Sequence, residues 1–300
     1  MKKLNSTDYN ALNYILNNKK LKKIELSKLL DITQPAIYKL VKKLSNLNLL
    51  ILEENFDKRS KYNITINKDY KKIIGLYASM NSIEIIIFDL VGNILESFSY
   101  KINLTFIQKT KTRNFLLSEI EKIINDYGKE NIAGIGISMQ ACINSDLGIL
   151  ICSDLFNEKS IHIKEYIFKK FGIECIIENN IHAMLYTIDL FYNKNPNKIL
   201  YYNKEKTKGF SIMINNKIYK GANFSTGCLK NMNDEDIIKC INFLDIDTVI
   251  LDIAQENRKE LINVLQCNSI VFNELENLEK LSAVTIVIRN LFDNEKLIKL

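Results

Sequence analysis

The sequence predicts two domains, a small α+β domain over residues 1–68 and a larger α/β domain over residues 69–300. Residues 1–70 carry 14 Lys and Arg against 7 Asp and Glu, a net charge of +7. The whole chain has 41 Lys and Arg and 35 Asp and Glu, so residues 71–300 carry 27 basic and 28 acidic residues, a net charge of −1. Helical stripes of apolar residues precede two strand-like runs in the first region, whereas strand-like and helix-like segments alternate beyond it. A basic module beside a near-neutral body indicates a polyanionic partner for the first domain only.

The composition excludes several classes of protein. No apolar run approaches the ~20 residues that span a bilayer, and the polar sequence from Asn5 onward contains no secretory core. We therefore expect a cytoplasmic protein without a membrane partner. The six cysteines include no C-x-x-C pair, which argues against a disulfide framework or a cysteine-rich metal site. Most of the cysteines are expected to be small buried side chains, and no metal or cofactor is expected.

Apolar residues at helical spacing predict three helices in the first domain, over residues 8–17, 25–30 and 34–47. The inward side of the second helix is expected to consist of three leucines, Leu26, Leu29 and Leu30. Thr33 is expected to be the N-cap of the third helix, and Pro35 falls in its first turn, where a missing N–H is harmless. A short helix, a tight turn and a longer basic helix are typical of the helix-turn-helix, in which the second helix of the pair enters the major groove.

Two strand-like runs, residues 49–53 and 61–66, follow the third helix and are joined by a polar tip. They predict a wing that reaches backbone phosphate or the minor groove. The first domain is thus predicted to be an α+β winged helix-turn-helix domain that binds double-stranded DNA. The alternative is a three-helix domain whose lysines only face solvent. The base-edge candidates are Gln34, Tyr38 and Lys39. The phosphate candidates are Lys42, Lys43, Lys58, Arg59 and Lys61.

The second domain alternates strand-like and helix-like segments, which predicts a mixed sheet with crossover helices. Strands are expected at residues 73–77, 83–89, 94–102, 132–138 and 174–178, and helices at 112–127 and 162–171. Four segments of this domain resemble the ROK family of repressors, open reading frames and sugar kinases: residues 74–97, 134–148, 171–183 and 211–227. Residues 243–253 resemble the family more weakly. The resemblance implies an α/β actin-like ATPase (ribonuclease H-like) two-lobed domain.

The departures from the ROK kinases bear on activity. The family's first phosphate loop contains Asp and Gly, and residues 77–81 contain neither. Asn180 stands where the family has its catalytic Asp, and an amide cannot accept the proton of a sugar hydroxyl. Residues 205–209 replace a second phosphate loop that is rich in Thr and Gly. Three parts of the phosphoryl-transfer apparatus are missing together, so the resemblance implies a chain that is not an enzyme.

The family's zinc site is also altered. Asn231 stands at the position of the zinc-binding His, and residues 232–236 replace the cysteine trio. Cys228 occupies the position of a Glu that contacts sugar in the family. The residues that the resemblance places near the sugar pocket are Asp154, Asn179, Asn180 and Asn231. His182, which replaces an Asn of the same motif, is interpreted as structural.

Together these features predict a transcription regulator, of the repressor type, that binds DNA as a homodimer. They leave open whether a sugar or sugar derivative controls it or whether it acts without a ligand. One alternative is a regulator or scaffold that acts through protein partners and keeps only a vestigial pocket. The remaining alternative is an active sugar kinase with a DNA-binding extension.

Overall fold

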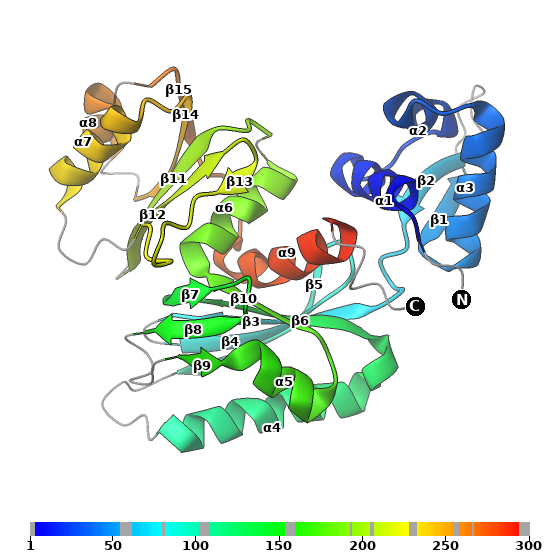
Figure 1. Ribbon diagram of the computed structural model, residues 1–300, viewed down its shortest axis with the longest axis horizontal. Helices are drawn as coiled ribbons and strands as arrows, with labels where there is room; N and C mark the ends of the chain where they lie inside the picture. The colour runs from blue at the N-terminus through cyan, green and yellow to red at the C-terminus, as the bar shows by residue number, and fades with distance from the viewer. Residues whose placement is uncertain are drawn as a thin grey trace.

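The computed structural model describes residues 4–54, 62–79, 82–101, 109–153, 160–192, 194–204, 207–227, 233–254, 258–265 and 267–293. Three regions are evident in Figure 1: an N-terminal module on one side and two lobes stacked beside it. No helix within the described ranges combines the length and the apolar character needed to cross a membrane.

The N-terminal module, defined here as residues 4–54 and 62–66, contains three helices and a hairpin. Its elements are α1 (Ser6–Asn18), α2 (Lys23–Leu30), α3 (Gln34–Asn46), β1 (Leu50–Glu54) and β2 (Tyr62–Ile66). A capping box starts α1, because the Asn5 side chain accepts from the Asp8 amide (2.9 Å) and the Asp8 carboxylate accepts from the Asn5 amide (2.8 Å). The strands pair antiparallel with Leu50 opposite Ile66. The three predicted helices and both strands are confirmed.

One inward-facing residue of α2 was predicted wrongly, because Leu29 is 43% exposed. At about 100° per residue, Leu26, Leu30 and Ser27 span one arc of the helix, and Leu29 lies outside it. Leu26 and Ser27 are buried, and Leu30 is half-buried. The stripe of leucines therefore does not mark the inward face of so short a helix.

Lobe 1 is built on a five-stranded sheet with the strand order β10-β6-β3-β4-β5. Its strands are β3 (Lys72–Ala78), β4 (Ser82–Phe88), β5 (Ile94–Lys101), β6 (Ile132–Met139) and β10 (Cys175–Asn179). The first three form an antiparallel meander, and β6 and β10 run parallel to β3. Helices α4 (Lys109–Tyr127) and α5 (Ile163–Phe171) cover one face. A small sheet of β7 (Cys142–Asn144), β8 (Ile149–Cys152) and β9 (Ile161–His162) adjoins the lobe.

Lobe 2 is built on a second five-stranded sheet with the order β13-β12-β11-β14-β15. Its strands are β11 (Lys198–Lys204), β12 (Thr207–Ile214), β13 (Lys217–Ile218), β14 (Thr248–Ile253) and β15 (Ser269–Phe272). Strands β11, β14 and β15 are parallel neighbours. Helices α7 (Asp234–Leu244) and α8 (Arg258–Val264) lie on its outer side, as Figure 1 shows.

Two helices, α6 (Asn180–Phe191) and α9 (Leu278–Asp293), pack against each other between the lobes. Close contact between α9 and β6 requires glycine at position 136, because a Cβ there would lie 1.9 Å from the carbonyl oxygen of Ala283. The other end of α9 contacts the N-terminal module, where the Asn13 side chain donates to the carbonyl oxygen of Phe292 (3.0 Å). Helix α9 thus touches both lobes and α1.

The cysteines are less buried than predicted. Among the described residues, Cys175 is buried, Cys142, Cys240 and Cys267 are half-buried, and Cys152 is exposed. Cys152 ends the short strand β8 at the margin of its sheet, where little covers it.

Candidate functional site

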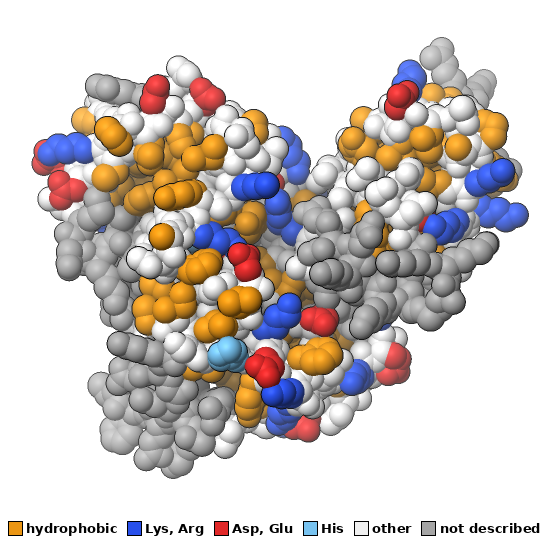
Figure 2. Space-filling view, in the orientation of Figure 1, with side chains coloured by type: hydrophobic (Ala, Val, Ile, Leu, Met, Phe, Trp, Pro, Cys, Tyr) orange, Lys and Arg blue, Asp and Glu red, His pale blue; other side chains and the backbone are white. Residues whose placement is uncertain are grey.

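Helix α3 presents a polar face to solvent. Its N-cap is Thr33, as predicted, although the threonine side chain makes no capping hydrogen bond, and Pro35 lies in the first turn. The inward face consists of Ile37, Leu40, Val41 and Leu44. The outward face carries four of the predicted DNA-contacting residues, Gln34, Tyr38, Lys39 and Lys42, and all four are exposed. Lys and Arg side chains gather along the outer edge of this module in Figure 2.

Two contacts fix the start of this face. The Gln34 side chain donates to the Ser27 hydroxyl (2.7 Å), which joins α3 to α2. The Lys23 ammonium lies 4.5 Å from the centre of the Tyr38 ring, and that side chain is 60% exposed. The side chains of Gln34 and Tyr38, in the first two turns of α3, therefore both contact α2.

Lys43 differs from the other predicted lysines. Its ammonium is paired with the buried carboxylate of Asp8, so that it joins α3 to α1. A buried carboxylate without this partner would be costly, which gives Lys43 a structural role. Three further phosphate candidates, Lys58, Arg59 and Lys61, lie outside the described residues.

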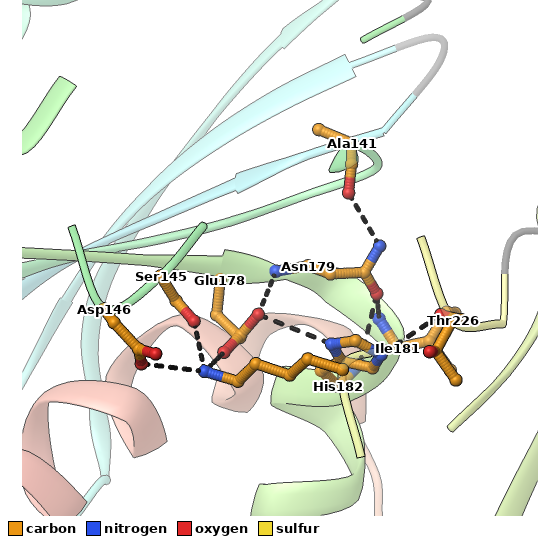
Figure 3. A network of polar contacts seen from close by, with 9 residues as sticks. Ala141, Ser145, Asp146, Glu178, Asn179, Ile181, His182 and Thr226 are labelled. Atoms are coloured by element: carbon orange, nitrogen blue, oxygen red, sulfur yellow. Dashed lines mark hydrogen bonds and ion pairs between the residues drawn. The ribbon is translucent and has the colours of Figure 1, made fainter. Parts of the chain in front are cut away.

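A second polar site lies where β10 ends and α6 begins (Figure 3). Asn179 is the N-cap of α6, and its side-chain oxygen accepts from the amides of Ile181 (2.9 Å) and His182 (3.2 Å). Its side-chain nitrogen donates to the carbonyl oxygen of Ala141 (2.9 Å). Asn179, a predicted sugar-pocket residue, therefore connects α6 to the segment that enters β7.

Asn180 is the next residue, and its surroundings are unusual. Its side chain is buried, with 1% of the residue exposed, and neither its amide oxygen nor its amide nitrogen has a hydrogen-bond partner among the described residues. A buried polar group without a partner costs about 1–3 kcal/mol. Most buried polar side-chain atoms in folded proteins have at least one partner, so this amide is an exception. The other two predicted pocket residues, Asp154 and Asn231, lie outside the described residues.

Beside Asn180, a buried carboxylate joins the two lobes. Glu178 lies 3.5 Å from the His182 ring and 3.4 Å from the Lys220 ammonium, which comes from lobe 2. Burial favours the neutral acid, but the hydrogen bond and charge of His182 and the charge of Lys220 outweigh it and hold the pKa of Glu178 below its ordinary value. The other ring nitrogen of His182 lies 3.3 Å from the carbonyl oxygen of Thr226. The structural role expected for His182 agrees with this placement.

The Lys220 ammonium also contacts Ser145 and lies 3.3 Å from Asp146, both in the turn between β7 and β8 (Figure 3). Burial lowers the pKa of Lys220, but the negative charges around it, that of Glu178 first, outweigh burial and raise it. A pocket of about 210 Å³ opens beside these groups. Its polar lining includes Ser145, Asp146, Glu178, Tyr186, Lys220 and Arg289. Sequence reasoning missed Lys220 and this turn, because nothing local in the sequence links them.

A third polar cluster lies where the parallel strands β11 and β14 end. The buried Asp252 carboxylate is paired with the Lys204 ammonium and accepts from the Asn273 side chain (3.0 Å). Burial outweighs both partners and raises the pKa of Asp252. Nearby, the Tyr202 hydroxyl donates to Glu279 (2.6 Å). Ligands of open α/β sheets commonly bind at the carboxyl ends of parallel strands, and here the protein's own charged groups occupy that position.

The segment that replaces the family's first phosphate loop, residues 77–81, is described only in part, because residues 80–81 lie outside the described residues. The Ser79 amide donates to the carbonyl oxygen of Ser82 (2.9 Å). In residues 205–209, which replace the family's second phosphate loop, residues 205–206 also lie outside the described residues. Among the described His, Cys, Asp and Glu side chains, no three gather closely enough to hold a metal ion.

The model of the ROK family matches residues 73–229. A xylose repressor of Staphylococcus xylosus is 27% identical, over 96% of this chain and 79% of that protein. A xylose repressor of Caldicellulosiruptor bescii is 24% identical, over 71% of this chain and 54% of its own length. This chain thus spans little more than half of the second relative.

Solved structures show the same fold. A ROK family transcriptional regulator, a homologue of the E. coli Mlc protein, superposes with a TM-score of 0.74 at 14% identity, over 96% of this chain and 97% of that one. The ROK hexokinase of Thermus thermophilus superposes with a TM-score of 0.56 at 10% identity, over 73% of this chain and 98% of the kinase. The two-lobed body has the actin-like fold that ROK regulators and kinases share, and helices precede it. The chain belongs to the ROK family.

Proposed function

We propose that this protein is a transcription repressor that binds double-stranded DNA through the exposed face of α3, and that a sugar releases it from the DNA. The observation that carries the proposal is the polar face of Gln34, Tyr38, Lys39 and Lys42, which a three-helix module with a net basic charge presents to solvent. Relatives over most of the chain are named xylose repressors, which supports both the activity and a pentose as the first effector to test.

The N-terminal module is proposed to act as a winged helix-turn-helix, within a domain of residues 1–68 followed by a body of residues 69–300. Helix α3 would enter the major groove, and the hairpin of β1 and β2 would be the wing. Gln34, Tyr38 and Lys39 would contact base edges. Lys42, Lys58, Arg59 and Lys61 would contact phosphates. Lys43 is left out, because its ammonium is paired with Asp8.

The body is proposed to form a homodimer, so that two copies of α3 meet half-sites about one or more helical turns apart. The sugar would bind at the end of β10, where the buried amide of Asn180 has no partner within the part of the chain that the structure describes. A sugar hydroxyl both donates and accepts, and so satisfies both atoms of an amide. Asp154 and Asn231 are proposed to complete the pocket.

We propose further that the body does not transfer phosphate. An amide at position 180 cannot act as a base, and the Lys204–Asp252 pair already occupies the ends of β11 and β14. Incubation of the protein with ATP and xylose, glucose or N-acetylmannosamine should release no ADP. Turnover with any of these sugars would contradict this part of the proposal.

The DNA proposal is tested by fluorescence anisotropy with the promoter region of the protein's own gene, at several salt concentrations. Binding should weaken as the salt concentration rises. Lys42→Ala should make the plot of log K against log salt less steep by about 1, the contribution of one phosphate contact. Tyr38→Ala should change the sequence preference instead. Lys239→Ala, at an exposed lysine on α7, is the matched control and should leave affinity unchanged.

Equal, salt-independent binding to unrelated DNA would overturn the repressor proposal. If DNA binding is specific but no sugar changes it, the alternative is favoured, in which the regulator acts through protein partners and its pocket is vestigial. Removal of residues 70–300 would then abolish capture of that partner.

A further inference from the structure

Two cysteines face each other across the hairpin of β7 and β8. In the antiparallel register, Cys142 is directly opposite Cys152. Directly opposite residues of an antiparallel pair have Cα atoms about 4.5–5.5 Å apart, and disulfides span Cα separations of about 4.4–6.8 Å. Their side chains also point to the same face of the sheet. The pairing therefore places the two cysteines next to each other on adjacent strands, close to the backbone separation that a disulfide needs.

Contacts on both sides of the pair keep the strands together. Toward the turn, Ile143 pairs with Leu150. Away from the turn, the Ser153 hydroxyl donates to the carbonyl oxygen of Gln140 (3.1 Å). An irregularity of the register lies between Cys142 and Ile143, and such bulges increase the local twist of a strand. The small approach that an S–S bond requires can be made there.

The two thiols differ in access to solvent. Cys152 is exposed and Cys142 is half-buried. An oxidant from solution therefore reaches Cys152 first, and Cys142 is the neighbouring thiol that can resolve the product.

We propose that Cys142 and Cys152 form a reversible disulfide that closes the open end of this hairpin, with a low-molecular-weight disulfide such as oxidised glutathione as the oxidant. The Cys152 thiolate attacks one glutathione sulfur, forms a mixed disulfide and releases one glutathione thiolate. The Cys142 thiolate then attacks the Cys152 sulfur and releases the second. The two protons lost by the cysteines go to the two glutathione thiolates, and the two electrons lost by the protein reduce one glutathione disulfide.

The bridge would lie beside the pocket that the proposed function assigns to a sugar. Residue 141, next to Cys142, accepts from the Asn179 side chain that caps α6. Gln140 has a buried side-chain oxygen without a partner in the described structure. Oxidation would therefore stiffen one wall of the proposed sugar site, a consequence that rests on the proposed function, whereas the disulfide itself does not.

The test uses the reduced full-length protein, equilibrated with oxidised glutathione and analysed by intact mass and by peptide mapping without reductant. The wild type should lose two hydrogen atoms, carry no adduct and yield one linked peptide that contains positions 142 and 152. Cys142→Ser should instead retain one glutathione on Cys152. Cys267→Ser, at a half-buried cysteine of lobe 2, is the matched control and should behave as the wild type does.

A second measurement reports on the hairpin. Amide hydrogen exchange of residues 140–153 should slow several-fold on oxidation of the wild type and not of Cys142→Ser. A stable glutathione adduct on wild-type Cys152, or a bridge to another cysteine or to a second chain, would overturn the proposal. Neither measurement uses a sugar. If no sugar changes the DNA binding of the protein, that result therefore counts against the proposed function and not against the disulfide.

Discussion

Two places where parallel strands end differ in how their polar groups are satisfied. At the end of β14, Asp252 is buried but has Lys204 and Asn273 as partners. At the end of β10, Asn180 is equally buried and has no partner among the described residues. The first site is closed by the protein's own side chains, whereas the second, called here the open site, leaves the hydrogen bonds of an amide unmade. This difference is the reason for proposing the sugar site at the end of β10 and not at the end of β14.

The largest effect is expected at the closed site. Asp252→Leu removes the acceptor for Lys204 and Asn273, and should lower the free energy of unfolding by about 1–3 kcal/mol in urea titrations, because two donors lose their acceptor. The charge of Asp252 itself adds little to this cost, since burial raises its pKa and the Lys204 side chain is 40% exposed and can reach water. Glu235→Leu, at an exposed acid on α7, is the control and should leave the unfolding midpoint unchanged. An equally stable Asp252→Leu protein would mean that this pair does not close the site.

A matched change at the open site should have the opposite sign. Asn180→Leu removes a buried amide without partners, and should raise the free energy of unfolding by about 1–2 kcal/mol. The same variant should lose the thermal stabilisation that an effector sugar gives to the wild type. Asn180→Asp places a carboxyl in the same surroundings and should destabilise the protein. Loss of stability in Asn180→Leu would show that the amide has a partner after all.

The smallest effect is a difference in pH dependence between two buried acids. The pKa of Glu178 is lowered from 4.5, so its ionised form adds stability above that pH, which is lost as the pH falls through the folded-state value. The pKa of Asp252 is raised from 3.8, so its contribution is complete below that pH and is lost as the pH rises through the folded-state value.

Urea unfolding of Glu178→Gln and Asp252→Asn, each compared with the wild type between about pH 3 and pH 7, measures the two dependences. The cost of Glu178→Gln should shrink toward acid, and the cost of Asp252→Asn should shrink toward neutral pH. Parallel trends in the two variants would contradict the opposite pKa shifts.

Local patterns predicted the elements of the structure well. Features that depend only on neighbouring residues lie where the sequence placed them. They are the apolar stripe of α3, its N-cap at Thr33 and the strands of alternating apolar and polar residues. The inward face of α2 was less predictable, because two turns of helix give too few positions to define an arc.

Partners in the sites could not be predicted in this way. Lys220 meets Asp146 and Glu178 only because the two lobes come together, and no spacing along the chain encodes that contact. The same holds for Lys43, whose charge suggested DNA but whose partner is Asp8 on another helix. That Asn180 has no partner among the described residues depends on everything packed around it, and so it can be recognised only in the folded chain.

The contact between α1 and α9 has a consequence for the order of synthesis. The N-terminal module leaves the ribosome first, but the carbonyl oxygen that Asn13 binds belongs to Phe292, near the other end of the chain. The module therefore reaches its final seat on the body only after α9 has been translated. A nascent chain that is cut short before α9 lacks the contact that holds α1 in this orientation.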